Sequence, residues 1–424
     1  MAITKKSKLA IFGGEKTIPD GFIKPWPPIG DIDRKYILKA LEGPNYTYGP
    51  NCTSFEKEFA EWNGNRYAIL TNSGTAALHM AVAACGCGTG DEVIVPAYSW
   101  SSSTTCILHH NAIPVFVDID YKTMNIDTDK IEAAITPKTK AILVVHLHGL
   151  AVNMEKVCKI ARKYKLKVIE DACQSHGAEF KNKKVGLWGD CAAFSLNHNK
   201  CLTSGEGGFF VTNNEEMLNT AKMLWSFGET RKPNESRDYH AYALGWMYRS
   251  SELVAAFGRA QLTKLDRYLK IQEENALELI DGVKDISGLI TPFVPKGHKH
   301  IWYNLTMQID ARKLGYEGKD VAIRDAILKA LQAEGTQCGI WQRYILPAMT
   351  VFQAKNAYGK GCPWSCPNAR KVVYNPQAYP EAQKHCDTHF GMTMPLRAPN
   401  TRRTAKLLAR AFIKVFDNLS ALKI

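Results

Sequence analysis

The sequence predicts an α/β protein, with a large domain built on a central, mostly parallel sheet and a smaller C-terminal α+β domain. From about residue 54 to 270, short apolar runs alternate with segments of helical periodicity. Several of these runs are apolar almost throughout, which is typical of strands buried on both faces. The alternation stops after about residue 280, so we expect the N-terminal segment and large domain at 1–275 and the small domain at 276–424.

The elements can be placed in order from these patterns. The expected strands are 67–70, 92–95, 113–117, 141–145, 167–170, 192–195 and 208–211. Helices are expected at 74–84 and 154–164, and a long helical stretch from 250 to about 276 leads out of the large domain. Beyond it we expect a strand at 302–309 and helices at about 319–335 and 400–418. The segment 345–395 is rich in Pro, Gly, Cys and aromatic residues and is expected to form an elaborated loop.

Composition narrows the class of protein. With 45% apolar and 22% charged residues, the 424-residue chain is of ordinary globular type, and it has no run of the roughly 20 apolar residues that a membrane span needs. The net charge of +13 is dispersed and forms no basic block, so we expect no nucleic-acid partner. A basic cleft for a phosphorylated or nucleotide-linked substrate stays open as an alternative.

The cellular compartment and the metal content are read from two further features. The basic start of the chain lacks the apolar stretch of a signal peptide, so we expect a cytoplasmic protein. Most of the twelve cysteines are expected to be reduced, buried thiols. The spacing Cys362-x3-Cys366 is not typical of zinc ligands, and no metal is expected.

A first chemical motif is the turn Ser73-Gly74-Thr75, which joins an expected strand to an apolar helix. Backbone N–H groups at such a helix start can bind a phosphate, and glycine lets the chain approach closely. By itself the turn is more often a serine N-cap without a ligand.

The second and third motifs lie at strand ends. The strand 167–170 leads into Asp171, at the sheet edge where α/β proteins bind ligands. A carboxylate there can pair with a protonated pyridine nitrogen, although a helix cap is the equal alternative. Lys200 lies between the strand that ends at Ser195 and the glycine-rich turn 205–208, a setting that favours Schiff-base chemistry over an ordinary surface role.

With these motifs in this order, the chain resembles the DegT/StrS-type sugar aminotransferases, a branch of the fold-type I pyridoxal 5′-phosphate enzymes that includes scyllo-inosose and aminohydroxybenzoate-forming members. The resemblance covers nearly the whole chain. It rests on the Asp171 and Lys200 segments together with Tyr48-Gly49-Pro50, Phe55-Glu56, Pro96-Ala97-Tyr98-Ser99-Trp100, Val145-His146-Leu147-His148-Gly149 and Arg249-Ser250-Ser251-Glu252-Leu253.

The resemblance implies a role for each matching residue. Lys200 would form the Schiff base and later move a proton, and Asp171 would hold the pyridine nitrogen. Gln174 would meet the phenolic oxygen and Trp100 would stack on the ring. The phosphate would be held by Ser73, Gly74, Thr75 and Ser195. The residues expected to line the substrate pocket are His198, Asn199, Arg249, Arg343 and Tyr344, with Arg249 or Arg343 contacting an anionic group.

The resemblance also implies the activity. Glutamine or glutamate would donate an amino group to a keto sugar or keto cyclitol, in amino-sugar, aminocyclitol or antibiotic biosynthesis, and the active site would lie at a homodimer interface. Two alternatives stay open. Related sugar dehydratases carry His where this chain has Lys200, and a regulatory protein could bind the cofactor without turnover. The sequence leaves the acceptor unidentified.

One position departs from the family pattern. The family usually has Asn where this chain has Met247, and that Asn reaches the phosphate site of the neighbouring subunit. The thioether of Met247 cannot donate a hydrogen bond. The intersubunit contact is therefore in doubt unless Trp246 or Arg249 replaces it.

Overall fold

The computed structural model describes residues 8–230 and 237–422, and within them seven strands form one large sheet in the order β1-β9-β8-β5-β4-β2-β3. The parallel pairs are β2–β3, β2–β4, β4–β5 and β5–β8, while β9 is antiparallel to both of its neighbours. The α/β class and the mostly parallel sheet are thereby confirmed. The strands are β1 (Tyr67–Thr71), β2 (Glu92–Pro96), β3 (Ile113–Val117), β4 (Thr139–Val145), β5 (Lys167–Asp171), β8 (Cys191–Ser195) and β9 (Gly208–Thr212).

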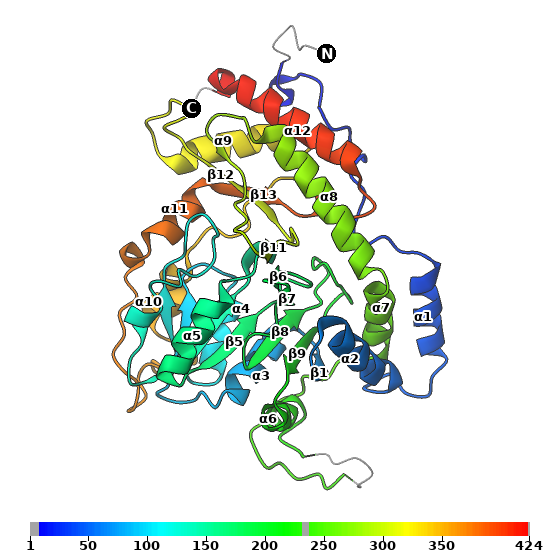
Figure 1. Cartoon of the computed structure of the whole chain (residues 1–424), viewed down its shortest axis with the longest axis vertical. Coiled ribbons are helices and arrows are strands. Elements are labelled where there is room, and N and C mark those ends of the chain that lie inside the picture. Colours follow the sequence, from blue (N-terminus) through cyan, green and yellow to red (C-terminus); the bar gives the residue numbers. More distant parts are fainter. Residues whose placement is uncertain (1–7, 231–236, 423–424) are drawn as a thin grey trace.

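Helices cover both faces of the sheet (Figure 1). Residues alternate between the faces: Val93 and Val95 of β2 pack in one core, and Ile94 packs in the other. This explains why the strands are apolar in nearly every position. One face carries α3 (Gly74–Ala84), α4 (Ser102–His109) and α6 (Glu215–Trp225), and the other carries α2 (Pro50–Asn63), α5 (Met154–Tyr164) and α7 (Glu252–Leu262).

The expected long helix at 250–276 is two helices. After α7 the chain turns at Thr263–Lys264, and α8 (Leu265–Val283) starts in a new direction. The turn is held by Lys264, whose Nζ lies 2.6 Å from Oδ1 of the fully buried Asp33 in α1 (Asp31–Leu41). Helical periodicity reflects only local spacing, so it cannot predict a break that depends on a residue so distant in the sequence.

A smaller α+β unit lies above the large sheet in Figure 1, reached through α8. Its antiparallel sheet has the order β10-β12-β13. The strands are β10 (Leu289–Ile290), β12 (Leu305–Ile309) and β13 (His389–Met392), and the helices are α9 (Asp320–Ala333), α11 (Pro380–Thr388) and α12 (Arg402–Asp417). The short strands β6 (Glu179–Phe180), β7 (Lys183–Lys184) and β11 (His298–Lys299) form a third sheet between the two units.

Two segments pack away from their sequence neighbours. Leu9 and Ile18, near the N-terminus, belong to the core of the small unit. Conversely, Phe352 and Tyr374, from the C-terminal part of the chain, pack in the large unit. Their ring centroids lie 5.1 and 5.3 Å from that of Phe116 in β3. The segment 345–395 is therefore a long loop only in its middle part: α10 (Thr350–Ala354) lies before it and α11 and β13 after it, while residues 355–375 contain no helix or strand. The boundary at 275/276 stays a prediction.

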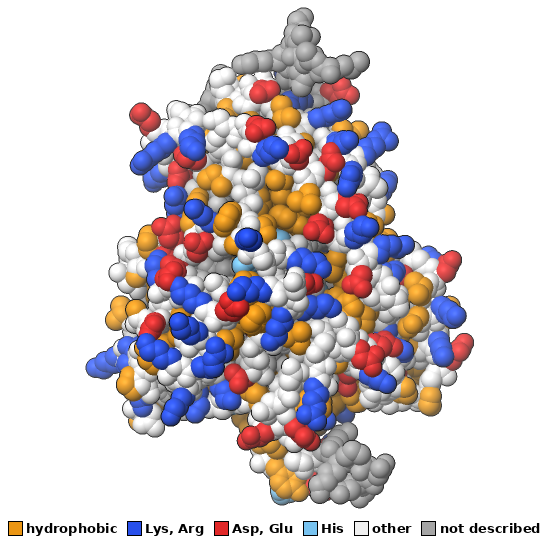
Figure 2. Space-filling view, in the orientation of Figure 1, with side chains coloured by type: hydrophobic (Ala, Val, Ile, Leu, Met, Phe, Trp, Pro, Cys, Tyr) orange, Lys and Arg blue, Asp and Glu red, His pale blue; other side chains and the backbone are white. Residues whose placement is uncertain are grey.

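The surface carries mixed charge. Figure 2 shows Lys and Arg side chains interspersed with Asp and Glu over the face in view. Among the described residues, no helix is both long and apolar enough to cross a membrane. Within the same residues, no three His, Cys, Asp or Glu side chains are arranged to hold a metal ion.

Candidate active site

The start of α3 forms an anion-binding corner at the end of β1. Ser73 caps the helix, because its Oγ accepts a hydrogen bond from Ala76 N at 3.1 Å. The N–H groups of Gly74 and Thr75 begin the helix and have no acceptor within it. A Cβ on Gly74 would lie 2.7 Å from Cβ of Ser195, so only glycine lets the start of α3 approach the end of β8 this closely.

A buried carboxylate stands at the carboxyl end of β5. Asp171 is 4% exposed, and both of its oxygens are oriented: Ser103 Oγ donates to Oδ2 at 2.7 Å and Cys173 N donates to Oδ1 at 3.1 Å. Ser99 extends the chain of hydroxyls, with its Oγ 2.8 Å from Ser103 Oγ. The carboxylate is therefore fixed in direction before any ligand binds.

Gln174 is oriented by a backbone contact. Its Oε1 accepts a hydrogen bond from the N–H of His148 at 3.0 Å. The acceptor end of the amide is thus occupied, and the Nε2 hydrogens remain to donate to a ligand oxygen.

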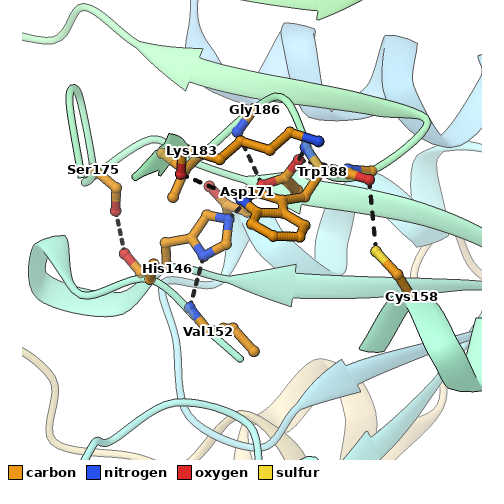
Figure 3. A network of polar contacts seen from close by, with 12 residues as sticks. His146, Val152, Cys158, Asp171, Ser175, Lys183, Gly186 and Trp188 are labelled. Atoms are coloured by element: carbon orange, nitrogen blue, oxygen red, sulfur yellow. Dashed lines mark hydrogen bonds and ion pairs between the residues drawn. The ribbon is translucent and has the colours of Figure 1, made fainter. Parts of the chain in front are cut away.

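A buried hydrogen-bond network surrounds His146 beside Asp171, as Figure 3 shows. Glu170 accepts a hydrogen bond from His146 Nε2 at 2.9 Å and others from the N–H groups of Gly186, Trp188 and Gly189. Because Nδ1 of His146 accepts from Val152 N at 3.0 Å, the ring hydrogen lies on Nε2 and points at Glu170.

This network supports the residues that face the pocket. Burial would raise the pKa of Glu170, but the hydrogen bonds from His146 and the backbone outweigh it and lower that pKa below its usual range. The backbone of His146 is joined to the next strand, since its N–H donates to Asp171 O at 3.1 Å and its carbonyl accepts from Ser175 Oγ. The end of β5 is consequently held from below as well as from the sides.

Lys200 enters the same cavity from the loop after β8. Its Nζ donates a hydrogen bond to Tyr303 Oη at 3.3 Å, and that hydroxyl donates to Asn199 Oδ1 at 3.4 Å. Trp100, which is 53% exposed, and Trp341 form an aromatic side of the cavity, with ring centroids 6.2 Å apart. The amine thus faces a space bounded by a carboxylate, an amide, a helix start and two indoles.

The structure brings most of the expected site residues together in this cavity and leaves four outside its lining. The expected residues that line it are Ser73, Gly74, Thr75, Trp100, Asp171, Gln174, Ser195, Asn199 and Lys200. His198, Arg343 and Tyr344 are exposed on the surface. Arg249 lines a neighbouring hollow together with Met247, and that hollow shares Glu206 with the main cavity.

Beyond these nine residues and Trp341, the lining includes five residues that were not expected: Ser102, Cys173, Asn197, Glu206 and Tyr303. Asn197 and Glu206 flank Lys200 in sequence, so their positions could have suggested them. Tyr303 lies 103 residues from Lys200, and no local pattern points to it. Burial, followed by the nearby Asp171, raises the pKa of the Cys173 thiol, which keeps it neutral beside the carboxylate.

These residues fit pyridoxal 5′-phosphate. The start of α3 and Ser195 would hold the phosphate, Asp171 the protonated ring nitrogen and Gln174 the phenolic oxygen, while Lys200 would form the Schiff base. When bound, the cofactor supplies an electron sink for the substrate carbon. A fold-type I sheet with this set of groups defines the class of pyridoxal-phosphate-dependent proteins.

The comparison with known proteins gives the family. Residues 28–385 match the DegT/DnrJ/EryC1/StrS aminotransferase family, and the chain belongs to it. This confirms the resemblance, the fold type and the cofactor that the sequence predicted.

Two curated relatives and one solved structure illustrate the range of the family. GDP-perosamine synthase of Caulobacter vibrioides is 37% identical over 313 residues, which is 73% of this chain and 81% of the relative. The L-glutamine:2-deoxy-scyllo-inosose aminotransferase of Streptomyces lividus is 37% identical over 264 residues, or 61% of this chain and 62% of the relative. The crystal structure of 3-amino-5-hydroxybenzoic acid synthase superposes with a TM-score of 0.80 at 28% identity, covering 92% of this chain and 98% of the other.

Proposed function

We propose that this aminotransferase moves an amino group from glutamine or glutamate to the keto group of a sugar or cyclitol. The observation that carries the proposal is the amine of Lys200 in one cavity with Asp171, Gln174 and the start of α3. In this role Lys200 binds the cofactor and, once released, acts as the base that moves a proton at the substrate carbon. The Asp171 side chain would pair with the ring nitrogen of the bound cofactor.

The lining of the cavity supports a polyhydroxylated ring as the acceptor. Asn197, Asn199 and Glu206 offer donors and acceptors for hydroxyl groups, and Trp100 and Trp341 offer apolar faces for the ring C–H groups. The names of the two curated relatives, GDP-perosamine synthase and L-glutamine:2-deoxy-scyllo-inosose aminotransferase, support the same class. The second name also supports glutamine as the donor.

An arginine contact with an anionic group of the donor or acceptor is part of the proposal. Arg249 supports this contact because it lines the hollow that shares Glu206 with the cavity, whereas Arg343 is exposed two residues after Trp341. Replacing each arginine with Ala tests the contact. An increase in KM for one substrate is expected with Arg249→Ala, and unchanged KM values for both substrates in both variants would rule the contact out.

A homodimer in the cytoplasm completes the proposal. The segment 237–247 carries exposed apolar side chains, with Tyr239, Tyr242, Leu244 and Met247 between 50% and 77% exposed, which is unusual for a surface that meets only water. All the cysteines are free thiols, in keeping with a reducing compartment. Sedimentation equilibrium should give twice the chain mass, and a monomer at micromolar concentration would contradict the dimer.

The decisive experiment is the visible absorbance of the purified protein before and after borohydride, followed by peptide mapping. We expect an absorbance band that borohydride traps on Lys200 and that bleaches when glutamine or glutamate is added. Analysis of the product from a keto sugar or keto cyclitol then separates amination from dehydration. A protein that binds the cofactor but does not bleach with either donor would favour the regulatory alternative.

A further inference from the structure

Arg397 is a buried arginine directly behind Lys200. It follows η6 (Met394–Leu396) in the small unit and is 1% exposed. Across residues 8–230 and 237–422, no carboxylate lies within ion-pair distance of its guanidinium. A buried guanidinium without a counter-ion needs well-placed neutral acceptors for its hydrogens.

Those acceptors belong mainly to the turn that carries Lys200. Nη1 of Arg397 donates to the carbonyl oxygens of Asn199 at 2.8 Å and of Lys200 at 3.3 Å, and Nη2 lies 3.7 Å from Cys201 Sγ. Nε donates to Gln272 Oε1 in α8 at 3.1 Å. Three consecutive residues of the large unit are thus tied to one side chain of the small unit.

The Lys200 carbonyl has a second donor from a third part of the chain. Trp26 Nε1 donates to it at 3.1 Å, and the indole is 5% exposed. The guanidinium carbon of Arg397 lies 5.1 Å from the centre of the Trp26 ring, within the range of a cation–π contact. The peptide of Lys200 is therefore held from behind by two buried side chains.

Tyr303 connects this support to the amine. Nη2 of Arg397 donates to the Tyr303 carbonyl at 3.5 Å, and the guanidinium lies 5.5 Å from the centre of its ring. The Tyr303 hydroxyl gives its hydrogen to Asn199 Oδ1, so its lone pair faces Lys200 Nζ at 3.3 Å. The amine also lies 4.7 Å from the centre of the Tyr303 ring.

We propose that Arg397 and Tyr303 together aim Lys200 at the cofactor. Arg397 acts as a positioning residue through the carbonyls of Asn199 and Lys200, and Tyr303 acts on the amine itself. A free lysine side chain has many rotamers, and holding it in one direction raises the fraction of encounters that react. The inference rests on the proposed function, because it assigns a role toward the Schiff base on Lys200.

Two substitutions with matched controls test the proposal. Arg397→Lys keeps the positive charge but loses the forked geometry. Its control is Arg324→Lys, because Arg324 is 3% exposed and also donates to backbone carbonyls, those of Cys386 and His389, away from the cavity. Tyr303→Phe removes only the hydroxyl, and its control is Tyr374→Phe, whose buried hydroxyl donates to the Pro114 carbonyl.

The measurement is the rate at which cofactor-free protein gains the absorbance of the Lys200 adduct after mixing with pyridoxal phosphate, with thermal unfolding recorded in parallel. We expect a rate about 10-fold slower for Arg397→Lys and about 5-fold slower for Tyr303→Phe, from the loss of orientation. The two control variants should form the adduct at the rate of the unsubstituted protein, even where their unfolding temperature falls as far as that of the variant they are matched to.

The outcomes separate the two hypotheses. Unchanged adduct rates in Arg397→Lys and Tyr303→Phe would overturn the positioning role while leaving the proposed function intact. If Arg397→Lys does not fold, the rate of Tyr303→Phe decides. A protein that forms no adduct on Lys200 even without substitution would overturn the proposed function, and this inference with it.

Discussion

The cavity around Lys200 has two walls of different origin. The front wall consists of Ser73–Thr75, Asp171, Gln174 and Ser195, all at or just beyond the ends of strands in one sheet. The back wall lies behind the backbone of Lys200 and consists of Trp26, Gln272, Tyr303 and Arg397, which come from the N-terminal segment, α8 and the small unit. Of these four, Tyr303 alone lines the cavity itself. Trp26 and Arg397 reach the carbonyl of Lys200 from 174 and 197 residues away.

The two walls differ in role: the front wall supplies the groups that bind the ligand, and the back wall holds Lys200 in position. The front wall presents charges and N–H groups to the ligand, and each group stands in a short local motif. The back wall presents buried donors, the indole of Trp26 and the guanidinium of Arg397, to carbonyl oxygens of the protein's own backbone. Substitutions in the front wall should therefore change cofactor affinity or the chemical step, whereas those in the back wall should change how readily Lys200 reacts.

The largest effect is expected from Asp171→Asn in the front wall. The amide keeps an oxygen that can accept the Cys173 N–H, but it loses the charge that pairs with the ring nitrogen. We expect kcat to fall about 1,000-fold, or about 4 kcal/mol. Ser103→Ala, which removes a donor to Asp171 and keeps the charge, is the comparison and should cost about 10-fold. Equal losses in the two variants would contradict a role for the charge.

The next largest effect is expected from the loss of the Glu170 carboxylate, which lies beneath the front wall, and this effect depends on pH. The pKa of Glu170 in the folded protein lies below its ordinary value of 4.5. Its carboxylate therefore stabilises the fold above about pH 4.5, and that contribution is lost as the pH falls through the lowered folded pKa. We expect Glu170→Gln to lose about 3 kcal/mol of unfolding free energy at pH 7.

Urea unfolding of the protein and of Glu170→Gln at pH 7 and near pH 3 measures this effect. The gap between the two proteins should narrow at the lower pH. A gap that is the same at both pH values would show that the substitution acts through packing and not through the charge.

A smaller effect is expected from Gly74→Ala. The added Cβ would lie 2.7 Å from Ser195 Cβ and 3.0 Å from Cys173 Sγ, so the helix start must shift away from the phosphate position. We expect the affinity for pyridoxal phosphate to fall about 10-fold, or 1.4 kcal/mol. Gly88→Ala is the matched control, since a Cβ there meets nothing within 4 Å. Equal affinities for the two variants would remove the start of α3 from the phosphate site.

The smallest effect is expected from Met247→Asn. Met247 is 50% exposed. The family resemblance implies an Asn at this position that would reach the phosphate site of a neighbouring subunit. A restored hydrogen bond of about 1 kcal/mol should tighten cofactor binding about 5-fold. Leu244→Asn on the same exposed segment serves as the control. If Met247→Asn binds the cofactor no more tightly than Leu244→Asn, the intersubunit contact is made by another residue.

The contrast between the walls also explains how much could be predicted from the sequence. The strands before Ser73, Asp171 and Ser195 lie where the apolar runs indicated, and these side chains meet at one edge because parallel strands end together. Tyr303 and Arg397 follow no local pattern, since their partners, the Lys200 amine and the Asn199 carbonyl oxygen, are distant in the chain. The same limit explains the unexpected break between α7 and α8, which depends on the pairing of Lys264 with Asp33.

The core of each unit includes residues from the other part of the chain, and this affects how the protein unfolds. Leu9 and Ile18 complete the core of the small unit, while Phe352 and Tyr374 complete that of the large one. A chain cut at 275/276 would leave each piece without part of its interior, so the pieces should not be expressed separately in soluble form. Heat or denaturant should likewise melt both units in a single cooperative transition, and a protease nick between them should leave the halves associated.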